Sequence, residues 1–347
     1  MTQEICAPLP ETFAFDALPV SVETIQAHIQ EFFPHTRERG SWIQSLLLKT
    51  ALMLIRSLPA GVAWRLGKII GNTLYFLKLR RHVAMVNLDI VYGDTQSAAE
   101  KNAIYRASLI NFGQVIINYI RLPFAGKAFW ADHCELVNEK VLKEAINRKR
   151  GVLFIGGHIG MWDMAGGKVG MSGYPTSVVG KKIGNPVIND FVAKARASMN
   201  MGQILNKNTM AKILEGLARG EATVLAIDQN MKKERGVFVD WMGKPASSVK
   251  STAYMVKKSG AAVIPGFMIQ KGPRAFQVIL GEELEWLPCP EDPERELLIN
   301  TQNQARAVQE IILAHPELWF WIHKRWKIRP DGEPDPYARQ KKRQQPF

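Results

Sequence analysis

The stretch GVLFIGGHIGMWDMAGG, Gly151 to Gly167, decides how the rest of the sequence is interpreted. Its apolar run Val152 to Ile155 is short and ends in glycine, which is typical of a buried strand, and the glycines that follow permit a tight turn. Similar short runs recur downstream and alternate with stretches of helical period. This alternation predicts an α/β fold with a mostly parallel sheet flanked by helices. The other expected strands are Thr223 to Ile227, Ala262 to Ile269 and Ala275 to Leu280, and the clearest expected helices are Pro186 to Ser198 and Thr209 to Ala218.

The same stretch carries residues suited to acid–base chemistry. His158 and Asp163 follow the expected strand, and ligands in open α/β sheets bind beyond the carboxyl ends of the strands. On one regular helix the two side chains would point ~140° apart, but they can meet if His158 lies in the turn and Asp163 in the first turns of the next helix. The carboxylate would then hold one ring nitrogen and leave the other free to take a proton from a hydroxyl. The alternative is a histidine with a purely structural role.

The composition favours a polyanionic partner. The 347 residues include 45 Lys and Arg against 32 Asp and Glu, a net charge of +13, which attracts either nucleic acid or an anionic membrane surface. No RNP, helix-turn-helix or zinc-finger pattern accompanies the charge, so a basic nucleic-acid-binding protein is the weaker alternative and we expect no nucleic acid partner. Cys6, Cys134 and Cys289 are widely spaced and form no CxxC pair, which argues against a disulfide framework and a metal site.

The N-terminal part of the sequence predicts membrane contact. Two apolar runs, Trp42 to Ile55 and Gly61 to Leu79, are interrupted by charged residues, whereas a spanning helix needs ~20 apolar residues, so we expect interfacial helices. A short span from Trp42 is the alternative. The second run ends in a basic cluster suited to anionic headgroups, made of Lys78, Arg80, Arg81 and His82. We predict four segments: an N-terminal extension (1–40), a helical membrane-associated region (41–125), an α/β catalytic domain (126–335) and a basic tail (336–347).

Five ordered blocks resemble one protein family. The blocks are GVLFIGGHIGMWDMAG (151–166), AIDQN (226–230), GVFVDWMGKPAS (236–247), GAAVIPGF (260–267) and WIHKRWKIRP (321–330). Together they are similar to the bacterial lipid A lauroyl/myristoyl acyltransferases, which belong to the lysophospholipid acyltransferase superfamily with its H-x4-D/E motif. The resemblance implies an α/β acyltransferase domain, an N-terminal membrane attachment and transfer of an acyl group from a thioester donor.

The resemblance also implies substrates and a location. The donor would be acyl carrier protein or acyl-CoA, the acceptor a hydroxyl of a membrane glycolipid such as a lipid A precursor, and no cofactor would be needed. A lysophospholipid or another glycolipid is the alternative acceptor. Because the sequence has no GxSxG elbow, we expect direct transfer with His158 as general base, and backbone N–H groups of the glycine turn as oxyanion donors. The enzyme is expected at the inner membrane, with its catalytic domain on the cytoplasmic side.

Further residues are assigned roles through the same blocks. Asp163 stands where the lipid A branch usually has Glu, and Lys181 stands where it usually has Arg; either cation can meet a phosphate. Arg235 and Arg325 are expected to bind substrate phosphates in the same way. Three polar residues that follow an expected strand should order the pocket: Asp228, Gln229 and Asn230. The presence of both His158 and Asp163 argues against a non-catalytic scaffold of the same fold.

Overall fold

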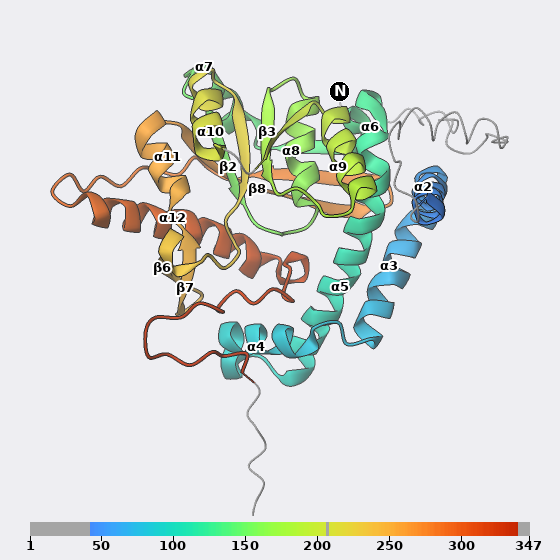
Figure 1. Cartoon of the computed structure of the whole chain (residues 1–347), viewed down its shortest axis with the longest axis horizontal. Coiled ribbons are helices and arrows are strands. Elements are labelled where there is room, and N and C mark those ends of the chain that lie inside the picture. The colour runs from blue at the N-terminus through green and yellow to red at the C-terminus, as the bar shows by residue number, and fades with distance from the viewer. Residues whose placement is uncertain (1–41, 206–207, 339–347) are drawn as a thin grey trace, which may run out of the picture.

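A computed structural model describes residues 42–205 and 208–338 and confirms the α/β fold (Figure 1). Its centre is a seven-stranded sheet in the order β1-β9-β8-β2-β5-β3-β4, in which all neighbours are parallel except the antiparallel pair β8 and β9. A separate antiparallel hairpin, β6 with β7, stands apart from the sheet. The strands are β1 (Cys134–Val137), β2 (Val152–Gly156), β3 (Thr176–Gly180), β4 (Met201–Leu205), β5 (Ala222–Ala226), β6 (Gly236–Trp241), β7 (Lys244–Val249), β8 (Ala262–Gly272) and β9 (Ala275–Leu280).

Strand residues alternate between two hydrophobic cores, one on each face of the sheet. In β2, Val152 and Phe154 belong to the core beneath α6, α7 and α8, whereas Leu153 and Ile155 belong to the core beneath α10, α11 and α12. Because both faces are covered, the central strand β2 is apolar throughout, as the sequence pattern indicates. These helices are α6 (Gly126–His133), α7 (Glu139–Asn147), α8 (Trp162–Met171), α10 (Thr209–Ala218), α11 (Ser251–Ser259) and α12 (Pro293–Ala314).

Helices α2 to α5 precede the sheet, and α5 runs beside it with α3 on its outer side (Figure 1). The bounds are α2 (Trp42–Ser57), α3 (Ala60–Phe76), α4 (Arg81–Tyr92), α5 (Ala98–Arg121) and, packed on α2, α9 (Pro186–Ser198). Glycines bring α3 and α5 close together: a side chain on Gly113 would overlap the carbonyl oxygen of Gly67, and one on Gly71 would overlap the backbone of Ile110. Among the described helices, none is long and apolar enough to cross a bilayer.

The expected elements can be compared directly with the observed ones. The predicted helices Pro186–Ser198 and Thr209–Ala218 are α9 and α10, and the predicted strand Ala275–Leu280 is β9. The two N-terminal apolar runs are α2 and α3. The predicted extension (1–40) and positions 339–347 of the basic tail lie outside the described residues.

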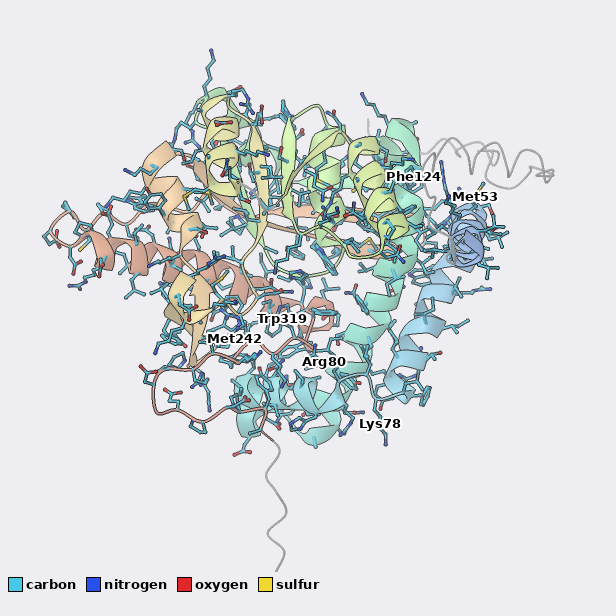
Figure 2. All side chains as sticks on the ribbon, viewed as in Figure 1. Met53, Lys78, Arg80, Phe124, Met242 and Trp319 are labelled. Atoms are coloured by element: carbon cyan, nitrogen blue, oxygen red, sulfur yellow. The ribbon has the colours of Figure 1, made fainter. Side chains whose placement is uncertain are left out.

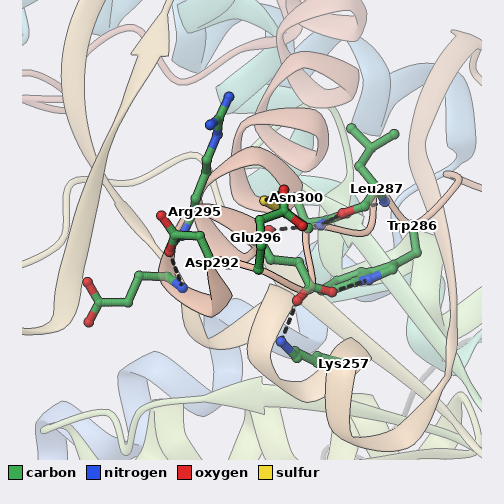
Figure 3. A network of polar contacts seen from close by, with 10 residues as sticks. Lys257, Trp286, Leu287, Asp292, Arg295, Glu296 and Asn300 are labelled. Carbon is green, nitrogen blue, oxygen red and sulfur yellow. Dashed lines mark hydrogen bonds and ion pairs between the residues drawn. The ribbon is translucent and has the colours of Figure 1, made fainter.

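A polar network anchors the start of α12 (Figure 3). Asp292 caps the helix by accepting hydrogen bonds from two backbone N–H groups of its first turn. The buried Glu296 follows one turn later, accepts a hydrogen bond from the Trp286 indole at 2.8 Å and pairs with Lys257 of α11. These contacts fix the register of α12 and therefore the point at which the C-terminal segment leaves it.

Candidate active site

His158 lies in the turn after β2, and its ring is held by Asp228 from the turn after β5. Nδ1 of His158 lies 2.9 Å from Oδ1 of Asp228, and the backbone N–H of His158 donates to Oδ2 at 3.0 Å. The indole N–H of Trp319 donates to the same Oδ2 at 2.9 Å. Strand register explains this meeting: Gly156 of β2 pairs with Ala226 of β5, and the histidine and the aspartate each follow two positions later.

Burial and charge set the protonation states of this pair. Burial disfavours the charged carboxylate, but the charge of His158 and the hydrogen bonds from His158 and Trp319 outweigh it and lower the pKa of Asp228 to about 2. Burial also disfavours the imidazolium, but Asp228 and then Asp163 outweigh it and raise the pKa of His158 above its ordinary value. Because Nδ1 donates to the carboxylate, Nε2 is the basic nitrogen of the neutral ring. The ring can therefore accept a proton at Nε2.

Asp163 has other partners, so the expected hydrogen bond between His158 and Asp163 is wrong. The Asp163 carboxylate lies in the first turn of α8 and accepts from the Tyr119 hydroxyl at 2.6 Å and from Arg196 Nε and Nη2 at 2.9 and 3.2 Å. These partners lie on α5 and α9, and the ring of His158 is held by Asp228 instead. Burial disfavours the charge on Arg196, but Asp163 and Tyr119 outweigh it, so the pKa of Arg196 is raised. The sequence alone does not indicate that Tyr119 or Arg196 belongs to the site.

Glycine is required at two positions of the turn from Gly157 to Met161, the catalytic turn, which follows β2 and holds the candidate base His158. A Cβ on Gly157 would lie 2.8 Å from Cγ of Asp228, and Gly160 has a φ of +54° and approaches the Met268 carbonyl group. Three backbone N–H groups of this turn already have acceptors within the protein. They are His158 to Asp228 at 3.0 Å, Gly160 to Leu318 O at 3.0 Å and Met161 to Met268 O at 3.0 Å. For these three groups the expected oxyanion role is wrong.

A cavity of about 820 Å³ opens beside His158 at the carboxyl edge of the sheet. On the α8 face its floor is a row of small residues from four adjacent strands, which ends at Leu280 of β9. The row consists of Gly180 (β3), Ala226 (β5), Gly156 (β2) and Gly266 (β8). Strands lie ~4.8 Å apart, so the four spacings from β3 to β9 span about 19 Å. The missing side chains leave a trough between the sheet and α8, and Arg196 lies over its β3 end, because a Cβ on Gly180 would lie 2.8 Å from Nη1.

Four of the expected binding residues line this cavity: Lys181, Gln229, Asn230 and Arg235. Lys181 and Arg235 are exposed and line its mouth, together with Lys232. The amide nitrogen of Gln229 lies 3.2 Å from each ring nitrogen of His158. When the ring is neutral and Nδ1 carries the proton, only Nε2 can accept a hydrogen bond from this amide. The substrate-binding roles of these residues stay predictions. Across residues 42–205 and 208–338, no group of three His, Cys, Asp or Glu side chains could hold a metal ion.

Asn230 and Arg325 order the protein around the cavity. Asn230 lines the cavity, but its side-chain oxygen accepts from the backbone N–H of Ile328 at 2.9 Å. Arg325 is 0% exposed, donates to the Ser247 carbonyl oxygen at 2.7 Å and lies over the Trp241 ring, 4.2 Å from its centroid. Burial lowers the pKa of Arg325. An enclosed guanidinium cannot reach a phosphate, so the expected substrate contact of Arg325 is wrong.

Comparisons with known proteins agree with the residue blocks. The family described as bacterial lipid A biosynthesis acyltransferase matches residues 29–328. The lipid A biosynthesis lauroyltransferase of Escherichia coli (strain K12) is 25% identical over 295 residues, covering 82% of this chain and 92% of the relative. The lipid A biosynthesis palmitoleoyltransferase of the same organism is 26% identical over 300 residues, covering 82% and 92%. The lipid A biosynthesis myristoyltransferase of Escherichia coli (strain K12) is 22% identical over 317 residues, covering 90% of this chain and 95% of the relative. The chain therefore belongs to the bacterial lipid A biosynthesis acyltransferase family and is an acyltransferase.

Proposed function

We propose that this acyltransferase moves a fatty acyl group from a thioester donor to a hydroxyl of a lipid A precursor, with His158 as general base and Asp228 as its partner. The observation that carries the proposal is the His158–Asp228 pair, at 2.9 Å, beside a cavity with an apolar trough. A hydroxyl attacks a thioester usefully only if its proton leaves as the new bond forms, and a neutral imidazole with a pKa near the working pH is suited to take it.

The reaction proceeds by direct transfer. The acceptor oxygen attacks the thioester carbonyl carbon while Nε2 of His158 takes its proton, and Asp228 stabilises the imidazolium that forms. The tetrahedral intermediate then expels the thiolate, which takes the proton from the imidazolium. The C–O bond of the new ester replaces the C–S bond of the thioester, and His158 returns to its neutral state.

Polar groups around the ring support the charges that develop. The Gln229 amide lies beside Nε2, where it can donate to the carbonyl oxygen of the intermediate once that oxygen carries negative charge. Lys181 and Arg235 at the mouth suit the phosphates of a phosphopantetheine donor and of a phosphorylated acceptor. The trough from β3 to β9 matches an extended hydrocarbon chain in shape and polarity, so we place the acyl chain there. The donor carrier is acyl carrier protein or coenzyme A.

We further propose that α2 and α3 lie on the cytoplasmic surface of the inner membrane. Large apolar side chains on these helices and at the C-cap of α3 face solvent: Leu47 is 65% exposed, Ile69 61%, Phe76 70% and the C-cap residue Leu77 73%. Burying such a side chain contributes ~1.5–3 kcal/mol. Basic residues, among them Lys78 and Arg80, lie at the turn between α3 and α4 (Figure 2), next to Phe76 and Leu77, where anionic headgroups would meet them.

Vesicle flotation at high salt tests the membrane proposal. Replacing Phe76 and Leu77 together by Ser should release the protein, because apolar burial is not screened by salt whereas charge attraction is. Leu313→Ser is the matched control, since Leu313 is an exposed leucine on α12, away from α2 and α3. Equal binding of both variants would contradict the proposed surface.

The reaction itself is tested with purified protein. It should add one acyl group, detected by mass, to a lipid A precursor when given acyl carrier protein or coenzyme A thioesters. His158→Ala should lower kcat at least ~10²-fold without changing Tm, and His133→Ala, on α6, is the control for loss of a histidine. Transfer to a lysophospholipid but not to the lipid A precursor would overturn the acceptor. Normal turnover in His158→Ala would overturn the mechanism.

A further inference from the structure

The C-terminal segment that follows α12 lies against the catalytic turn. The carbonyl oxygen of Leu318 accepts from the backbone N–H of Gly160 at 3.0 Å, and Ile159 forms an antiparallel bridge with Trp319. Two segments that lie far apart in the sequence, the turn after β2 and the segment after α12, therefore pack together around His158. From this position the indole N–H of Trp319 donates a hydrogen bond to the Asp228 carboxylate.

We infer that Trp319 is a positioning residue, whose indole N–H orients the Asp228 carboxylate so that its other oxygen holds Nδ1 of His158. This inference rests on the proposed function, since it concerns how the general base is prepared.

The hydrogen bonds divide the two carboxylate oxygens between different tasks. Oδ2 of Asp228 accepts from the His158 backbone N–H and from the Trp319 indole, whereas Oδ1 accepts from Nδ1 of His158. Two donors on Oδ2 fix the rotation of the carboxylate about its Cβ–Cγ bond. Without the indole, one backbone donor remains on Oδ2, and a buried carboxylate with an unfilled site can turn toward the ring or admit water.

Packing holds the indole itself in place. Trp319 is 2% exposed, and its ring meets that of Trp321 edge-on with centroids 4.7 Å apart. Trp241 and Trp326 lie further out, with centroids 6.4 and 6.5 Å from that of Trp319. An indole enclosed by three other rings cannot swing away, so its N–H is a preorganised donor.

Removing the indole N–H should change the titration of His158. The other charged or titratable groups that face the pair are Asp163 from α8, which raises the pKa of His158, and His323 and Arg325 from the C-terminal segment. The pKa of His323 is lowered to about 4, mainly by burial, so this ring is neutral near pH 7. With these groups unchanged, loss of a donor from the carboxylate concentrates its negative charge toward the ring. The imidazolium is then favoured, and the acid limb of kcat/KM, which reports the free base, moves to higher pH.

The test compares Trp319→Phe with Trp321→Phe. The control is matched because Trp321 is also a buried ring of the same cluster and also loses one indole hydrogen bond, but to the Pro316 carbonyl oxygen instead of Asp228. Trp319→Phe should lower kcat about tenfold to a hundredfold, the range for a hydrogen bond to a charged group, with KM little changed. The midpoint of the acid limb of Trp319→Phe should move to higher pH by roughly 0.5 unit. Trp321→Phe should lower Tm about as much as Trp319→Phe does. It should leave the midpoint of the acid limb unchanged.

Several outcomes decide the inference independently of folding yield, because the midpoint of a pH profile does not depend on the fraction of folded enzyme. An unmoved acid limb in Trp319→Phe, or equal shifts in both variants, would overturn it. Adding Trp319→Phe to Asp228→Asn should cost nothing further, and a fully additive loss would likewise overturn it. Normal activity in His158→Ala would instead mean that the proposed function fails. An inactive His158→Ala beside a normal pH profile in Trp319→Phe would overturn the positioning role alone.

Discussion

Exchanging each of two aspartates for asparagine should separate the catalytic carboxylate from the structural one. In Asp228→Asn, the His158 backbone N–H and the Trp319 indole both require an acceptor at the Oδ2 position, so the amide oxygen must lie there. The amide NH2 group then faces Nδ1, which must become an acceptor, and the proton of the neutral ring moves to Nε2. The base nitrogen is occupied, and we expect kcat to fall by ~10³–10⁴-fold, as in catalytic triads with the same exchange, at nearly unchanged KM.

Asp163→Asn should act mainly on stability. Asp163 and Arg196 are both largely buried, with side chains 7% and 13% exposed, and removing one charge leaves the guanidinium without its partner. Breaking a buried pair costs about 3–5 kcal/mol, which at about 2 °C per kcal/mol for a chain of this size lowers Tm by roughly 6–10 °C. The assays are kcat and KM at a temperature where both variants are folded, and Tm by circular dichroism. If Asp163→Asn lost as much kcat as Asp228→Asn with Tm unchanged, the assignment of the two carboxylates would be refuted.

Three further predictions concern the pH profile, the contact between α3 and α5, and Arg325. Because the proposed base is the neutral ring of His158, whose pKa is raised, kcat/KM should rise with pH through a midpoint above the ordinary value of ~6.5, and a flat profile from pH 5 to 8 would contradict this. Gly113→Ala should lower the free energy of unfolding by ~1–3 kcal/mol, measured in urea, because the new methyl group meets the Gly67 carbonyl oxygen and α3 must move away from α5. Arg325→Met should lower Tm, because the Ser247 carbonyl oxygen loses its donor, and should leave KM for both substrates unchanged; a large rise in KM would restore the phosphate-binding role.

Much of the fold could be predicted from local pattern. The apolar runs of β2, β5, β8 and β9 are flanked by glycine and turn residues, and α9 has a strong start, with Asn185 as N-cap and Pro186 in its first turn. β3 and β4 escaped prediction because a strand of five residues with Ser177 or Gly202 at its second position leaves too short an apolar run to distinguish it. The β6–β7 hairpin falls within a block that could be recognised by resemblance, but its strand pairing is not visible in the sequence.

The candidate site could be predicted only in part. His158 was identifiable because it follows a strand that the sequence defines clearly. Its partner could not be chosen between Asp163 and Asp228, because the choice depends on β2 and β5 being neighbours in the sheet, and strand order is a tertiary property. Tyr119, Arg196 and Trp319 come from three distant segments, and each reads locally as an ordinary helix or core residue. Sequence spacing favours Asp163 as the partner of His158, whereas the register of parallel strands favours Asp228.

The closure of the C-terminal segment on the catalytic turn also orders events in time. Synthesis proceeds from the N-terminus, so β2, β5 and both members of the His158–Asp228 pair leave the ribosome well before Trp319. Until that residue arrives, Gly160 lacks the Leu318 carbonyl acceptor and Asp228 lacks the indole donor. A nascent chain that ends before Trp319 therefore carries His158 and Asp228 without two contacts that align them, and without the buried rings of Trp319, Trp321 and Trp326. The proposed alignment of the base is therefore completed only after the C-terminal segment has been translated.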